Sequence, residues 1–128
     1  RIALLGTPGG SRIITMVLLA LLEFEQGANA KHMVQLPRFH HQYLPDQIQF
    51  EPDALSPKLQ NALQLLGHVL KPLESPYGNM QVLIWNKRSG RIDAASDPRG
   101  IGTASVPDLV GKGIIPFPRW QIGYQECR

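Results

Sequence analysis

The sequence predicts a single domain of the α/β class, because apolar segments of strand length and of helix length follow one another along 128 residues. Residues 2–5 and 80–85 are short apolar runs typical of strands. Residues 11–26 and 56–67 have the spacing and the end signals of helices. Turn residues such as Gly, Pro, Ser and Asn separate these segments, which places strands and helices in one mixed fold.

The charge balance excludes few function classes. There are 13 Lys and Arg residues against 10 Asp and Glu, for a formal net charge of +3. The small basic group of Lys87, Arg88 and Arg91 falls in a predicted turn, so we expect no nucleic-acid partner. The apolar run in the first helix is shorter than the ~20 residues that cross a bilayer, so we expect no membrane span. The single cysteine, Cys127, excludes a disulfide within the chain.

The turn between the first strand and the first helix is the strongest candidate site. Residues 7–10 read Thr-Pro-Gly-Gly, and Ser11 follows at the position expected for a helix N-cap. Adjacent glycines let the backbone approach a ligand, since no Cβ intervenes, and N–H groups at a helix start favour negative charge. The junction therefore suits an oxyanion. On the local pattern alone, a tight turn without a ligand is the favoured alternative.

The first strand and helix are predicted to be buried. Residues 2–5 read as a short buried strand. The helix at 11–26, with Gly27 as its stop signal, is apolar at nearly every position from 13 to 22. A one-sided surface helix would show regular polar positions, so this helix needs cover on most sides. A chain of this length is too small to supply that cover, which indicates missing partner sequence.

The middle of the chain predicts a short helix, a loop and a strand. Residues 28–36 continue as a second helix, and residues 38–46 read as a loop. His40 and His41 in this loop, with His32 and His68 as further candidates, raise the alternative of a metal site. They lack His-x-x-x-His spacing and a Glu or Cys at ligand spacing, so hydrogen-bonding histidines are favoured. Residues 47–51 alternate, with Ile48 and Phe50 on one face, and predict a strand.

The helix at 56–67 carries the clearest signals in the chain. Ser56 is the predicted N-cap, Pro57 the first helical residue and Gly67 the stop. An apolar stripe along one side predicts an ordinary helix packed against the core. The stripe consists of Leu59, Ala62, Leu63 and Leu66.

The second half predicts more strands and an irregular tail. A strand at 68–73 precedes a strand at 80–85, whose apolar residues on both faces indicate an internal position in a sheet. Residues 86–90 turn the chain and 91–96 return it as a hairpin. We expect Asp97 and Arg99 to form an ion pair or a turn cap with a structural role, and a catalytic role for Asp97 is the less favoured alternative. Residues 100–128 are rich in Gly and Pro and predict mostly irregular structure, which Phe117, Trp120 and Tyr124 would anchor.

Three segments together resemble the γ-glutamyltranspeptidase (γ-glutamyltransferase) family. They are TPGGSRIIT at 7–15, PRFHHQYLPD at 37–46 and ASDPR at 95–99, and they occur in the family's order. The resemblance covers residues 1–99 as the C-terminal portion of the small, catalytic subunit, whereas residues 100–128 depart from it. It implies a partial αββα sandwich of the N-terminal-nucleophile hydrolase type.

The resemblance also implies a chemistry. A threonine hydroxyl attacks the γ-glutamyl amide of glutathione or a related compound, and water or an amino acid then releases the γ-glutamyl group. Gly9 and Gly10 would bind the substrate through backbone N–H groups that form the oxyanion hole. No cofactor and no metal are implied. The family's threonine, which precursor self-cleavage exposes, and its γ-glutamyl-binding serines and acidic residue are absent from this chain.

The partners expected from the resemblance are therefore the large subunit and the missing N-terminal part of the small subunit. The family is exported, which implies a periplasmic, extracellular or cell-surface location. We expect this chain to be inactive by itself. A non-catalytic light-chain-like remnant that binds a partner is one alternative, and a relative that processes γ-linked polyglutamate is another.

Overall fold

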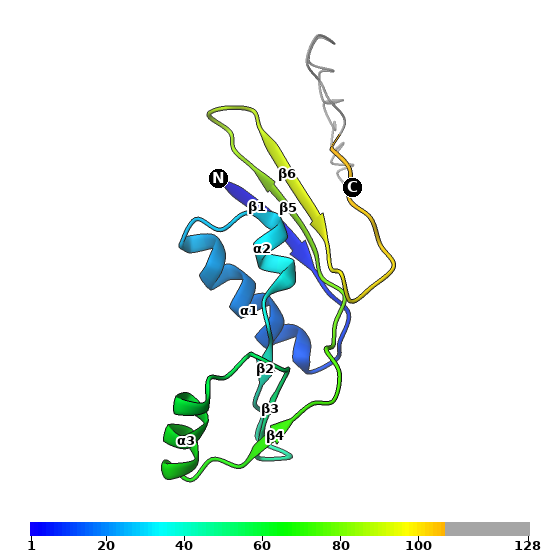
Figure 1. Cartoon of the computed structure of the whole chain (residues 1–128). Coiled ribbons are helices and arrows are strands. Elements are labelled where there is room, and N and C mark those ends of the chain that lie inside the picture. The colour runs from blue at the N-terminus through cyan, green and yellow to red at the C-terminus, as the bar shows by residue number, and fades with distance from the viewer. Residues whose placement is uncertain (107–128) are drawn as a thin grey trace, which may run out of the picture.

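The computed structural model describes residues 1–106 and has two small sheets and three helices within them (Figure 1). The chain order alternates strands and helices, which confirms the α/β class. The strands are β1 (Ile2–Gly6), β2 (Phe39–His40), β3 (Ile48–Phe50), β4 (Leu70–Pro72), β5 (Gln81–Trp85) and β6 (Ile92–Ser96). The helices are α1 (Arg12–Glu25), α2 (Ala30–Gln35) and α3 (Pro57–Leu65).

The larger sheet is antiparallel, in the order β1-β5-β6, so β5 has the internal position predicted for it. The helices α1 and α2 lie on one face of this sheet (Figure 1). Side chains alternate across the sheet, and Leu5, Val82 and Ala95 join the core beneath the two helices. The largest members of that core are Met16, Met33 and Met80. Of the αββα order, the described residues thus supply one helical layer and one principal sheet.

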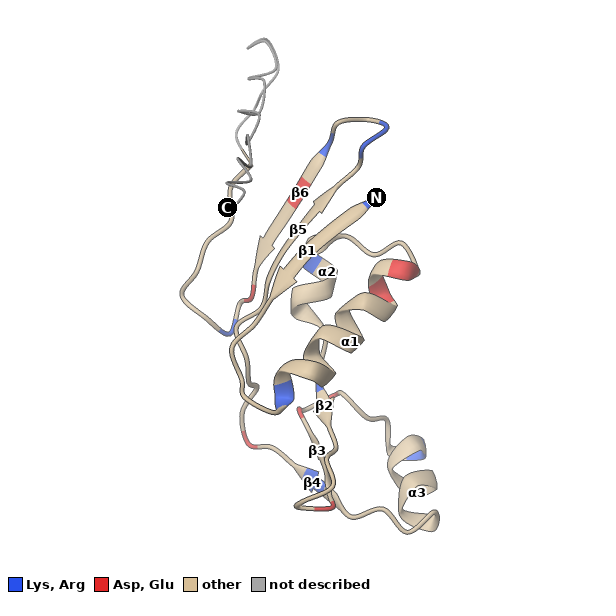
Figure 2. Ribbon diagram, turned by 180° about the vertical axis from the view of Figure 1, so that it is seen from behind, with Lys and Arg blue, Asp and Glu red and all other residues tan. Residues whose placement is uncertain are grey.

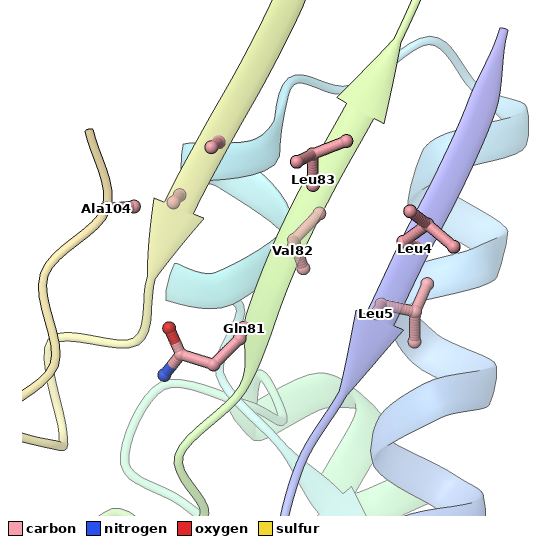
Figure 3. A pocket seen from close by; sticks show the side chains of 8 residues that line it. Leu4, Leu5, Gln81, Val82, Leu83 and Ala104 are labelled. Atoms are coloured by element: carbon pink, nitrogen blue, oxygen red, sulfur yellow. The ribbon is translucent and has the colours of Figure 1, made fainter. Parts of the chain in front are cut away.

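The opposite face of the larger sheet is open, which makes the prediction of a buried first strand wrong. Leu4 is 65% exposed and stands in register with Leu83, whose own partner across the sheet is Ala94. These three residues and Ala104 line a shallow hollow on that face (Figure 3). Local apolar character in β1 therefore reflects a face that the described part of the chain leaves uncovered.

Helix α1 is covered on one side only. Met16 and Ala20 are buried against the sheet and α2, whereas Ile14 is 77% exposed and Leu18 52% exposed. The helix ends before Gly27, which has φ +94° as expected for a helix stop. The sequence predicted that this helix needs cover on most sides. Within residues 1–106 only one side is covered, so the other side is an exposed apolar surface.

The smaller sheet is mixed, with β2 antiparallel and β4 parallel to β3. Ile48 and Phe50 of β3 are buried together with Leu55, as the alternating pattern predicted. The prediction of an uninterrupted loop at 38–46 was wrong at its start, because Phe39 pairs with Phe50 to form β2. A strand of two residues is too short to show an alternating sequence pattern, so only its pairing with β3 reveals it.

Helix α3 has the predicted ends and part of the predicted packing. The Ser56 hydroxyl accepts a hydrogen bond from the Leu59 N–H at 3.3 Å, Pro57 opens the helix and Gly67 follows it with φ +91°. No residue of α3 is buried, and Leu66 of the apolar stripe is 76% exposed. Leu63 of the stripe packs, partly buried, against the core of Ile48, Phe50 and Leu55, whereas the rest of the stripe is exposed within the described chain.

Residues 100–106 have no helix or strand, as predicted for the start of the tail. The expected anchoring by Phe117, Trp120 and Tyr124 falls outside the described residues. Among residues 1–106, no helix is both long enough and apolar enough to cross a bilayer.

Candidate functional site

The glycine pair lies between the end of β1 and the start of α1. Gly9 has φ +150° and Gly10 has φ +59°, and both values favour glycine over residues with a Cβ. The carbonyls of Gly9 and Gly10 accept hydrogen bonds from the N–H groups of Arg12 and Ile13, at 3.2 and 3.1 Å. The turn therefore runs directly into the first turn of the helix.

The N–H groups of Gly9 and Gly10 donate to no acceptor within residues 1–106. Both glycines are exposed, and a Cβ at Gly10 would meet no atom within 4 Å. Ser11 stands at the N-cap position, but its side chain makes no capping hydrogen bond and its backbone is helical. The predicted capping role of Ser11 is thus wrong, and the start of α1 presents donors without a local side-chain acceptor.

Two flanking residues connect this turn to the segment before β5. The Thr7 hydroxyl accepts a hydrogen bond from the Asn79 N–H at 3.3 Å. The Arg12 guanidinium lies 4.5 Å from the centre of the Tyr77 ring and donates to Gln49 Oε1 in β3. The glycine pair is therefore bracketed by contacts to residues far away in the sequence.

A buried group of charges lies behind this segment. Asp97 is fully buried, and its carboxylate accepts hydrogen bonds from Arg38 Nη2 at 2.6 Å and from the Met80 N–H at 2.9 Å. Its other oxygen accepts from the Arg99 N–H at 3.0 Å and from Arg99 Nη1 at 3.1 Å. The predicted ion pair of Asp97 and Arg99 is confirmed, and it also caps the end of β6.

Burial alone would raise the pKa of Asp97, but the hydrogen bonds from Met80, Arg99 and Arg38 outweigh it and hold that pKa below its usual value. The carboxylate is therefore ionised at neutral pH. Burial would lower the pKa of Arg99, but hydrogen bonds to Glu51 and Asp97 raise it instead. The ion pair is thus fully charged in the folded protein.

Glu51 completes this network from the end of β3. It accepts from Arg99 Nη2 at 2.6 Å, from the Arg38 N–H at 2.9 Å and from the Tyr77 N–H at 2.8 Å. Both carboxylate oxygens are satisfied, which a buried charge requires. Sequence reasoning missed Glu51, Tyr77 and Asn79, because each acts through residues that the fold brings from other segments.

The histidines form hydrogen bonds rather than a cluster. The His40 ring is buried between the Thr15 hydroxyl at 2.7 Å and Gln42 Oε1 at 2.8 Å, which confirms the expected hydrogen-bonding role. His41 lies 2.7 Å from Asp46 Oδ1 on the surface. Within residues 1–106, no group of three or more His, Cys, Asp or Glu has an arrangement that could hold a metal.

The basic residues of the predicted turn lie far from the glycine pair. Figure 2 shows the Lys and Arg residues of the β5–β6 turn at one end of the larger sheet, whereas α1 begins near its other end. The charge of this turn therefore does not contribute to the surface around Gly9 and Gly10.

Comparison with known proteins gives a consistent assignment. A family model described as Gamma-glutamyltranspeptidase matches residues 1–106. The Glutathione hydrolase proenzyme of Escherichia coli (strain K12) is 37% identical over 97 residues, which are 75% of this chain and 16% of that protein. The chain therefore spans less than one fifth of the length of this curated relative.

Solved structures share the fold as well as the sequence. The Gamma-glutamyltranspeptidase from Pseudomonas nitroreducens, complexed with L-DON, is 34% identical and superposes with a TM-score of 0.72, over 82% of this chain and 55% of that chain. The Bacillus anthracis transpeptidase enzyme CapD is 28% identical with a TM-score of 0.71, over 82% of this chain and 63% of that chain. Together with the family model, which matches well over half of the residues, these likenesses show that the chain belongs to the γ-glutamyltranspeptidase family.

Proposed function

We propose that this chain is part of a γ-glutamyltransferase and supplies the oxyanion hole of its active site through the N–H groups of Gly9 and Gly10. One observation carries the proposal. Two adjacent glycines at the start of α1 have exposed N–H groups without acceptors among the described residues. Such a pair of donors suits the negative oxygen that develops during acyl transfer.

The chemistry requires a tetrahedral intermediate at the γ-glutamyl carbonyl. A threonine hydroxyl attacks the amide carbon, and the carbonyl oxygen becomes an oxyanion that accepts hydrogen bonds from the glycine N–H groups. Collapse of the intermediate expels the amine and leaves an acyl-enzyme, which water or an amino acid opens by the same route. Loss of one oxyanion donor typically raises the barrier by about 2.7–4 kcal/mol.

The nucleophile and the groups that hold the α-amino and α-carboxylate groups are assigned to the missing N-terminal part of the small subunit. The proposed partners are the large subunit and this missing part. The proposed substrates are glutathione and related γ-glutamyl compounds. Precursor self-cleavage and a periplasmic or extracellular location belong to the same proposal. Residues 1–99 are assigned to the small-subunit portion and residues 100–128 to a separate tail, and this chain alone is expected to be inactive.

The test compares two glycines of like geometry in the full-length enzyme. Gly10 and Gly90 have φ values of +59° and +71°, and a Cβ at either one would meet nothing within 4 Å. Gly90 lies in the β5–β6 turn, away from α1. We expect Gly10→Val to lower kcat for γ-glutamyl hydrolysis by about 100-fold or more, and the matched control Gly90→Val to retain it. Equal turnover in the two variants would remove the oxyanion assignment.

A non-catalytic remnant that binds a partner is the second candidate. The exposed apolar surfaces of α1 and of the larger sheet favour it, because contiguous apolar patches mark interaction sites. Intact mass and N-terminal sequencing of every polypeptide in the purified sample separate the two candidates. A companion polypeptide with an N-terminal threonine supports the transferase, and a sample of these 128 residues alone supports the binding protein. Substrate profiling with glutathione and γ-linked polyglutamate then identifies the acyl donor.

A further inference from the structure

We propose that Thr7 and Arg12 are positioning residues that fix the Gly9–Gly10 turn against the segment from Tyr77 to Asn79. The inference rests on the proposed oxyanion role of the glycines and adds residues to it. It predicts that side chains which never touch the substrate set the alignment of the two N–H donors.

The first anchor lies just before the glycines. Thr7 Oγ1 accepts the Asn79 N–H at 3.3 Å and donates to the carbonyl of Pro8 at 3.0 Å. One hydroxyl thus connects the end of β1 to the residue that leads into β5 and to the residue before Gly9. A valine at this position has nearly the same shape but can form neither bond.

The second anchor lies just after the glycines. The Arg12 guanidinium packs 4.5 Å from the centre of the Tyr77 ring and donates to Gln49 Oε1. A guanidinium over an aromatic face is attracted by the negative face of the ring, and the attraction is stronger where water is excluded. Arg12 is the first residue of α1, so its position sets where the helix begins.

The segment that receives both anchors is itself held from behind. The Tyr77 N–H donates to Glu51 Oε1 at 2.8 Å, and its carbonyl accepts a hydrogen bond from Arg38 Nη1. Gly78 passes so close to Arg38 and Met16 that a Cβ would lie 2.6 Å from either side chain. The anchors therefore connect the turn to the buried Glu51–Arg38–Asp97–Arg99 network rather than to a free loop.

Such anchoring matters because glycine has the largest conformational freedom of any residue. Oxyanion donors must lie within about 0.5 Å of their working positions to stabilise the intermediate. A pair of glycines cannot hold that geometry alone, since glycine has no side chain that could pack against or bond to a neighbour. The residues on either side of the pair must supply the restraint.

The ring of Tyr77, rather than its hydroxyl, makes the contact with Arg12. The hydroxyl is buried and has no hydrogen-bond partner within the described residues. Burial, and then the charge of Glu51, raise the pKa of Tyr77, so the phenol is neutral at physiological pH. The variant Tyr77→Phe keeps the aromatic face, whereas Tyr77→Leu removes it.

The experiment measures kcat, KM and the thermal midpoint of full-length enzyme variants with glutathione as substrate. The test variants are Thr7→Val, Arg12→Gln and Tyr77→Leu. The matched controls are Thr103→Val, at an exposed position that makes no side-chain hydrogen bond among the described residues, and Arg88→Gln, at an exposed position in the β5–β6 turn. We expect each test variant to lower kcat at least about tenfold with KM within about twofold, because oxyanion donors act in the transition state and not in substrate binding.

The conservative variant Tyr77→Phe is expected to recover most of the turnover that Tyr77→Leu loses. If Gly10→Val is impaired, either of two results would overturn the inference and leave the proposed function in place. One is an equal loss of kcat in Tyr77→Phe and Tyr77→Leu. The other is an unchanged kcat in both Arg12→Gln and Thr7→Val. Full activity of Gly10→Val would instead overturn the proposed function, and the inference with it. A change confined to the thermal midpoint would show a structural role only and would also refute positioning.

Discussion

Arg38 and Asp97 form a buried ion pair, with Arg38 Nη2 2.6 Å from Asp97 Oδ2. The two residues are 59 positions apart in the sequence, and neither side chain is more than 2% exposed. Arg38 lies just before β2 of the smaller sheet and Asp97 just after β6 of the larger sheet, so the pair links segments that belong to the two sheets. Two of the three segments that resemble the family, at 37–46 and 95–99, thus meet in one contact.

Removal of one partner should therefore destabilise the full-length protein strongly. We expect Arg38→Met to lower the free energy of unfolding by about 3–5 kcal/mol, because the Asp97 carboxylate would stay buried without its main cation. Urea denaturation measures the change. The exposed pair of His41 and Asp46 is the control, since Asp46→Asn should change stability by at most about 1 kcal/mol. Similar values for both variants would contradict a stabilising role for the buried Arg38–Asp97 pair.

Acid should weaken the fold through Asp97. Its pKa in the folded protein lies below the ordinary value of 3.8, so the unfolded chain takes up the proton first as the pH falls. The stabilisation is complete above pH 3.8 and is lost as the pH falls from there through the lower, folded pKa. Urea midpoints of the wild type and of Asp97→Asn, measured from neutral pH downward, test this. The variant should have a shallower decline in that acid range, and parallel curves would disprove the linkage.

The two serines at helix starts should respond differently to truncation. Ser56→Ala removes the hydroxyl that accepts the Leu59 N–H and should destabilise the protein by about 1 kcal/mol. Ser11→Ala should change the free energy of unfolding by only about 0.3 kcal/mol, because its side chain makes no capping hydrogen bond. Thermal midpoints of the two variants give the comparison. A larger loss for Ser11→Ala would show that its hydroxyl caps α1 after all.

Two glycines with positive φ should also differ. Gly78→Ala places a Cβ 2.6 Å from both Arg38 Nη1 and Met16 Sδ, at φ +89°. Gly90→Ala meets no atom within 4 Å, at φ +71°, so only the backbone penalty of about 1–2 kcal/mol applies. We expect Gly78→Ala to lose clearly more stability in urea denaturation. Equal losses would mean that the Arg38 and Met16 side chains move aside freely.

The sequence was sufficient where the signal is local. The ends of α3 follow from Ser56, Pro57 and Gly67, and the alternation at 47–51 predicted β3 with its buried face. Sequence-based prediction failed where the structure depends on contacts with residues that are distant in the sequence. β2 exists because Phe39 pairs with Phe50, and the network around Glu51 assembles residues from four separate segments.

The glycine pair shows the same division. Its place between strand and helix could be predicted from the residues themselves. Its contacts through Thr7 and Arg12 could not, because Asn79 and Tyr77 lie more than 60 residues further along the chain. The burial of β1 and α1 was misjudged for a related reason, since apolar composition shows a need for cover but not which segment provides it.

The long separation between Arg38 and Asp97 has a consequence for synthesis on the ribosome. Arg38 emerges 59 residues before its carboxylate, a delay of roughly 3–12 s at about 5–20 residues per second. Until β5 (Gln81–Trp85) has been made, β1 lacks its only pairing partner among the described strands, and the apolar side chains of α1 have no completed sheet to cover them. The nascent chain therefore exposes these apolar side chains for most of that interval, until β5 and then β6 have left the exit tunnel.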